Sequence, residues 1–122
     1  MDTKILVSKI RDLIADFAKD GKVVTCAHLV RAYPDYESSS FILAISCPWT
    51  IGYTSCFAKT EEVVSKMYQS LDSESLGMIH SVNVFDNDSE LEKFVKSGGE
   101  EWISNYCTEF INPINTHKEL VV

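Results

Sequence analysis

The first stretch of the chain alternates apolar and polar residues with the period of an α-helix. Its apolar positions are separated mostly by three or four residues, which places them on one face of a helix. They are Leu6, Ile10, Leu13, Ile14 and Phe17. Asp2 or Thr3 can cap the start of this helix, and Gly21 can end it. We therefore predict an amphipathic helix with Asp12 and Asp16 on its solvated side.

Two β-type segments follow this helix. Residues 22–33 are rich in β-branched and apolar types, and residues 41–45 are apolar on both faces, as in a strand that is covered on both sides. Pro34 and Asp35 break the run between them, and a polar loop over residues 37–40 leads to the second segment. We expect the two segments to pair as an antiparallel hairpin with a long loop.

The middle of the chain predicts an irregular loop and then a helix. Pro48 ends the second strand, and residues 49–57 form an aromatic-rich loop around Gly52. Thr60 supplies a hydroxyl that can cap a helix, and two glutamates follow it near the positive end of the helix dipole. A helix is therefore expected over residues 60–71.

A third strand is expected over residues 78–85, which follow Gly77. Strict alternation places His80 on the same face as Val82 and Val84, and Ile79 on the opposite face.

The C-terminal part of the chain predicts two further helices. A polar run at residues 86–89 is rich in capping residues and precedes a short helix that the glycine pair at 98–99 ends. A last helix is expected from Glu100 until Pro113 stops it. Its apolar face comprises Trp102, Ile103, Tyr106, Cys107 and Phe110. Residues 114–122 are expected to be a flexible tail.

Together these elements predict an α+β fold in the order α-β-β-α-β-α-α. We expect a small three- or four-stranded sheet packed by helices, with the region of residues 50–57 as the source of any fourth strand. The length of 122 residues fits one domain, which we assign to residues 1–113.

Four cysteines bear on the cellular compartment. Cys26, Cys47, Cys56 and Cys107 are spread along the chain, and none belongs to a C-x-x-C pair. No secretory signal is visible after Met1, so we expect a cytoplasmic protein with free thiols. The longest uninterrupted apolar run is too short for a membrane span.

Cys47 and two histidines are the candidates for catalysis. Cys47 is placed at a strand end, where His28 or His80 could act as its base, but this chemistry needs a lowered thiol pKa. Cys26 and His28 form a single C-x-H pair with no matching second pair, unlike a zinc site. We predict no catalytic residues, no metal and no cofactor. A small enzyme or ligand-binding domain that uses residues 47–53 remains the alternative.

Negative charge is concentrated in the second half of the chain. Residues 1–60 carry seven Lys/Arg and six Asp/Glu, whereas residues 61–122 carry four and twelve, for a net charge of −7. A field of this sign repels nucleic acid and anionic membranes and attracts basic proteins. Clustered Lys/Arg, which nucleic-acid binding requires, are missing from the sequence. We predict neither direct nucleic-acid binding nor membrane binding.

Acidic residues gather at the predicted segment ends at 72–76, 86–90 and 99–101, and they form one patch if these ends are neighbours. The residues that we single out for binding a partner are Asp86, Asp88, Glu90, Glu100 and Glu101, with Trp49 and Tyr53 as aromatic anchors. Charge accelerates association, and buried aromatic residues hold the complex together.

Bacterial immunity proteins share this small, acidic character. We therefore predict a protein-binding module that neutralises a basic partner, such as a nuclease toxin, by stoichiometric binding. A regulatory subunit of a larger assembly is a second alternative. The same charge also occurs on surfaces that are merely solvated, since acidic residues cap helices and keep proteins soluble.

Overall fold

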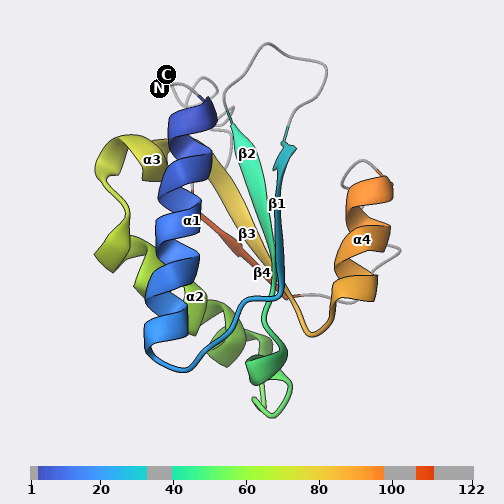
Figure 1. Cartoon of the computed structure of the whole chain (residues 1–122). Coiled ribbons are helices and arrows are strands. Elements are labelled where there is room, and N and C mark those ends of the chain that lie inside the picture. The colour runs from blue at the N-terminus through green and yellow to red at the C-terminus, as the bar shows by residue number, and fades with distance from the viewer. Residues whose placement is uncertain (1–2, 33–39, 98–106, 112–122) are drawn as a thin grey trace, which may run out of the picture.

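The computed structural model describes residues 3–32, 40–97 and 107–111 (Figure 1). Its elements in chain order are α1 (Thr3–Lys19), β1 (Cys26–Arg31), β2 (Phe41–Ser46), a 3-10 turn η1 (Pro48–Thr50), α2 (Cys56–Ser70), α3 (Ser73–Gly77), β3 (Ile79–Phe85), α4 (Asp88–Lys96) and β4 (Cys107–Phe110). The fold is α+β with a small sheet packed by helices, as the sequence predicts.

The four strands form one mixed sheet in the order β1-β2-β3-β4. The predicted hairpin is confirmed, because β1 pairs antiparallel with β2 and places Leu29 opposite Leu43. Strands β2 and β3 are parallel, so the chain must return through α2 and α3 to start β3 at the same end as β2. Strand β4 pairs antiparallel with β3 at the other edge.

Helices cover both faces of the sheet. Helices α1 and α2 pack on one face and α4 packs on the other (Figure 1). Side chains alternate along β2, so Leu43 and Ile45 join the larger core under α1 and α2, whereas Ala44 joins a smaller core under α4. In the smaller core the rings of Phe85 and Phe94 lie 5.5 Å apart.

A register shift at the start of β3 changes the predicted alternation. Phe41 pairs with Ile79, but the next residue, Ile42, pairs with Ser81. Because His80 is the additional residue, Ile79 lies in the same core as Val82 and Val84, contrary to the strict alternation expected from the sequence.

The N-terminus of α2 and the last strand both differ from expectation. Helix α2 begins at Cys56 rather than near Thr60, because the Ser55 side chain caps it by accepting a hydrogen bond from the Ala58 N–H. Residues 50–57 supply no strand. The fourth strand is instead Cys107–Phe110, which the helical spacing of its apolar residues had assigned to a last helix.

A disulfide joins Cys56 to Cys107 and ties the start of α2 to β4. Cys26 and Cys47 are free, so the expectation of four free thiols is wrong for one pair. The rest of the predicted last helix and the predicted tail at residues 114–122 lie outside the described residues. Within the described ranges no helix combines the length and the apolar character that crossing a membrane requires.

Candidate functional site

Two connections leave the sheet together at the carboxyl ends of the parallel strands β2 and β3. Cys47 and η1 follow β2, and Asp86 follows β3. The Cys47 N–H donates to the Phe85 carbonyl at 2.8 Å, and the Thr50 hydroxyl donates to Asp86 at 3.3 Å. Ligand sites of open α/β sheets form beyond the carboxyl ends of parallel strands, so this place is the first candidate for a functional surface.

Trp49 and Tyr53 are neighbours at this end of the sheet, as the binding prediction requires. Their rings are 6.0 Å apart in an edge-on arrangement, and Trp49 also packs on Phe17 at 5.6 Å. The Lys22 ammonium lies 5.5 Å from the centre of the Trp49 ring, within the range of a cation–π contact. Trp49 is therefore a half-buried extension of the larger core, and the equally half-buried Tyr53 packs against its edge.

The Tyr53 hydroxyl donates a hydrogen bond to Glu62 at 3.1 Å. Glu62 also forms an ion pair with Lys22 at 3.1 Å. Partial burial, followed by the hydrogen bond to Glu62, raises the pKa of Tyr53 above its ordinary value. The phenol is thus a neutral donor that α2 holds in place.

Asp86, the first of the predicted binding carboxylates, is neutralised within the protein. Lys59 of α2 contacts both of its oxygens, at 2.7 and 3.0 Å, and the Lys59 side chain is only 15% exposed. This pair joins the end of β3 to the start of α2. Asp86 therefore organises the surface more than it supplies free charge.

Asp88 and Glu90 lie in the first turn of α4, where the helix dipole favours carboxylates. Asp88 accepts a hydrogen bond from the Thr25 hydroxyl, and this bond, with a second from Ser46, lowers the pKa of Asp88. Asp88 stays exposed beside its partner. Glu90 pairs with Lys93, one turn further along the helix, at 3.4 Å.

Two exposed apolar residues at this end were missed by the sequence reasoning. Ile51 is 70% exposed at the end of η1, and Phe57 is 69% exposed in the first turn of α2. They flank Tyr53 in the chain. The sequence gives little indication of their exposure, because apolar residues in an aromatic-rich loop are expected to be buried. Only the cap at Ser55, which sets the start of α2, places Phe57 in the first turn of that helix. We call Ile51, Tyr53, Phe57 and the carboxylates of Glu62, Asp86 and Asp88 the sheet-end surface.

The single acidic patch expected from three segment ends does not form. Asp72 caps α3 and Glu74 belongs to it, and α3 precedes β3, whereas Asp86 and Asp88 follow β3. The seven residues of β3 separate the two groups by about 20 Å, at about 3.3 Å per residue. Asp72 instead caps α3 and pairs with Lys9 at 3.4 Å. Glu100 and Glu101 lie outside the described residues.

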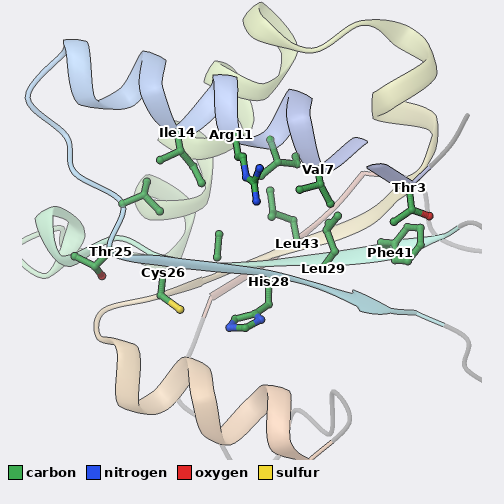
Figure 2. Close-up of a pocket in the computed structure, with 13 residues that line it drawn as sticks. Thr3, Val7, Arg11, Ile14, Thr25, Cys26, His28, Leu29, Phe41 and Leu43 are labelled. Atoms are coloured by element: carbon green, nitrogen blue, oxygen red, sulfur yellow. The ribbon is translucent and has the colours of Figure 1, made fainter. Parts of the chain in front are cut away.

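The arrangement around Cys47 does not support thiol catalysis. The side chain is fully buried in the core under α1 and α2, and burial, followed by the charge of Asp86, raises its pKa to about 12. His28 points to the α4 face of β1 (Figure 2), and His80 lies at the opposite end of β3. Neither imidazole is placed to take a proton from this thiol.

Metal binding has no geometric support in the part of the chain that the structure describes. There, no group of three or more His, Cys, Asp or Glu side chains could hold a metal ion. Cys26 and His28 lie on the same face of β1, but they form a pair alone.

No family model matches the chain, and no curated protein or solved structure resembles it closely enough to count as a match. The function must therefore be argued from the geometry of this molecule.

Proposed function

We propose that the sheet-end surface binds a basic protein. The observation that carries this proposal is the exposure of Ile51 and Phe57, at 70% and 69%, on either side of Tyr53. A contiguous apolar patch with a polar rim marks an interaction site, and our proposal is that Ile51 and Phe57 form such a patch with Tyr53. The carboxylates next to this loop are Glu62, which the Tyr53 hydroxyl contacts, and Asp86, which the Thr50 hydroxyl contacts, and their sign is the one that a basic partner requires.

The carboxylates of the surface come from three separate elements. Glu62 belongs to α2, Asp86 follows β3, and Asp88 opens α4. Asp86 and Glu62 are bound to Lys59 and Lys22, so the exposed Asp88 supplies the attraction at longer range together with the net charge of −7. In such an interface charge sets the rate of encounter, while buried aromatic and aliphatic anchors set the lifetime of the complex.

We further propose that binding is stoichiometric and neutralises the partner, as an immunity-type inhibitor neutralises a nuclease toxin. An acidic surface can cover the basic groups with which a nuclease holds phosphates. The burial of Cys47 argues against the alternative of a small thiol enzyme. A regulatory subunit would use the same surface on a different partner.

Affinity capture with two matched variants tests the proposal. One variant carries Ile51→Ser and Phe57→Ser, and the control carries Ile5→Ser and Tyr68→Ser, which remove exposed apolar groups at 48% and 57% exposure away from η1. We expect the unmodified protein and the control to retain the same basic protein at low salt, and the first variant to lose it. Retention by all three, or capture of an acidic partner only, contradicts the proposal.

The rate of association gives a second, independent readout on the captured protein. Exchanging Asp88 for lysine should slow association at low ionic strength and make it less sensitive to added salt. If the captured protein degrades nucleic acid, loss of that activity at one equivalent of this chain supports the inhibitor role. Capture without inhibition favours a regulatory subunit.

A further inference from the structure

A groove of about 510 Å³ runs between α1 and the edge strand β1. Figure 2 shows Val7, Arg11 and Ile14 descending from α1 over the sheet, with Leu29 of β1 beneath Val7. The three α1 residues are spaced by four and three positions, so they form one stripe of the helix. No residue of the sheet-end surface lines this groove, but the two regions meet at Thr25, which lines the groove and donates a hydrogen bond to Asp88.

The outer edge of β1 is open in the described part of the sheet, where β1 has β2 as its single neighbour. The Ala32 N–H donates to the Ser40 carbonyl at 3.0 Å, which fixes the phase of the antiparallel ladder. Along an antiparallel strand, every second residue hydrogen-bonds to the neighbouring strand. The even-numbered residues of β1 therefore bond to β2, and the N–H and C=O groups of the odd-numbered residues point away from β2. Ala27 and Leu29 therefore present N–H and C=O groups to the groove side.

The groove has a charge opposite to that of the whole protein. The chain carries a net −7, yet none of the groove's lining residues is acidic, and Arg11 lies among them. Arg11 is exposed, and within the described ranges it forms no ion pair. An arginine held over apolar residues in this way is suited to a carboxylate that comes from another molecule.

We propose that β1 accepts an extended, acidic segment of a partner protein as an additional strand of the sheet. Main-chain hydrogen bonds to Ala27 and Leu29 give the affinity, as in other cases of strand addition. Side chains two positions apart in the incoming segment face α1 together. One of these is acidic and meets Arg11, and the other is apolar and packs between Val7 and Leu29.

A second copy of this chain is a poorer occupant for the same groove. Two-fold pairing of β1 with β1 places two Arg11 side chains along one edge, and the groove itself contributes no carboxylate to offset them. The partner segment is therefore a different protein. Being acidic, it is also different from the basic partner proposed for the sheet-end surface.

Nuclear magnetic resonance on the full chain tests the proposal with a defined probe. The probe is a blocked peptide that repeats valine, threonine, glutamate and threonine, so that valine and glutamate alternate on one face. The matched control peptide has lysine in place of glutamate. We expect the glutamate peptide to shift the amide signals of Ala27 and Leu29 and to slow their hydrogen exchange at least about tenfold. The lysine peptide should bind at least about tenfold more weakly.

Charge reversal gives the sharper result. Arg11→Glu should exchange the preference, so that the lysine peptide binds better, whereas Lys96→Glu on α4 makes the same change of charge and should leave the preference unaltered. Three outcomes overturn the proposal. The Ala27 and Leu29 signals do not change, the two peptides bind equally well, or Arg11→Glu does not reverse the preference between them. Protection of β1 that grows with protein concentration, without peptide, overturns it in favour of a second copy. The variant carrying Ile51→Ser and Phe57→Ser should keep the peptide, which separates this test from that of the sheet-end surface.

Discussion

The sheet-end surface and the β1 groove use charge in opposite ways. At the sheet end most charged and polar groups satisfy one another, as in the pairs Lys59–Asp86 and Tyr53–Glu62, and apart from Asp88 the exposed groups left over are apolar. In the groove the apolar residues line the walls, and Arg11 is the charge without an ion pair in the described structure. A charge that is paired within the protein thus stabilises the shape of a surface, whereas a charge without an ion pair is left to interact with a partner and to determine which partner binds.

The largest effect that separates the two regions is expected from the disulfide, which anchors the start of α2 at the sheet end. Replacing Cys56 and Cys107 by serine opens a cross-link that spans 51 residues, so the free energy of unfolding should fall by about 4 kcal/mol. Urea unfolding measures the loss, and Cys26→Ser is the control because this thiol is free. An unchanged midpoint contradicts a stabilising role for the bond.

The next effect compares one cation from each region. Lys59→Met leaves the half-buried Asp86 without its partner and should cost about 2 kcal/mol of stability. Arg11→Met removes no described ion pair and should change stability by less than about 0.5 kcal/mol. Both variants are compared by urea unfolding under identical conditions. If Lys59→Met and Arg11→Met lower the free energy of unfolding equally, the ion pair at the sheet end contributes no more to stability than Arg11 does.

Alkaline pH should weaken the protein through Cys47, which lies under the sheet end. Its folded pKa of about 12 is raised from an ordinary 9.0, so between these values the folded state keeps a proton that the unfolded state has lost. The free energy of unfolding therefore falls as pH rises, by at most about 1.4 kcal/mol per pH unit. Unfolding at several pH values in this window, repeated with Cys47→Ala, should show a shallower slope in the variant. An identical slope rules out Cys47 as the source.

The smallest effect concerns the cap that holds α4 beside the sheet end. The Asn87 side chain accepts from the Glu90 N–H at 2.9 Å, so Asn87→Ala should cost about 1 kcal/mol. Asn87→Asp keeps the acceptor and should restore most of this loss. Thermal unfolding followed by circular dichroism measures both variants. A variant with alanine that is as stable as the parent means that α4 is held by the packing of its apolar face, including Leu91 and Phe94, and not by the cap.

Local patterns in the sequence predict most of the fold because they depend on neighbouring residues. The apolar stripe of α1 and the buried run of β2 needed no information from elsewhere. Strand β4 was missed because it has four residues and is positioned by pairing with β3 and by the bond from Cys107 to Cys56. Both of these are distant in the sequence.

The candidate site was predicted in part for the same reason. Trp49 and Tyr53 lie together because only a few residues separate them. The predicted acidic patch required Asp72 and Asp86 to lie at the same end of β3, but they lie at opposite ends. Counting charges along the sequence gives no information about the end of the strand at which each residue lies. Arg11 and the open edge of β1 emerge only when α1 is packed over the sheet.

The order of the strands in space is the same as their order in the chain, β1-β2-β3-β4. During synthesis on the ribosome, each described strand that emerges finds its neighbour already present at the growing margin of the sheet, and none of these strands has to be inserted between two others. Domains are made from the N-terminus onward, so vectorial assembly of this kind leaves few wrong pairings open to a nascent chain. The outer edge of β1 is therefore the oldest part of the described sheet, and none of the later described strands covers it.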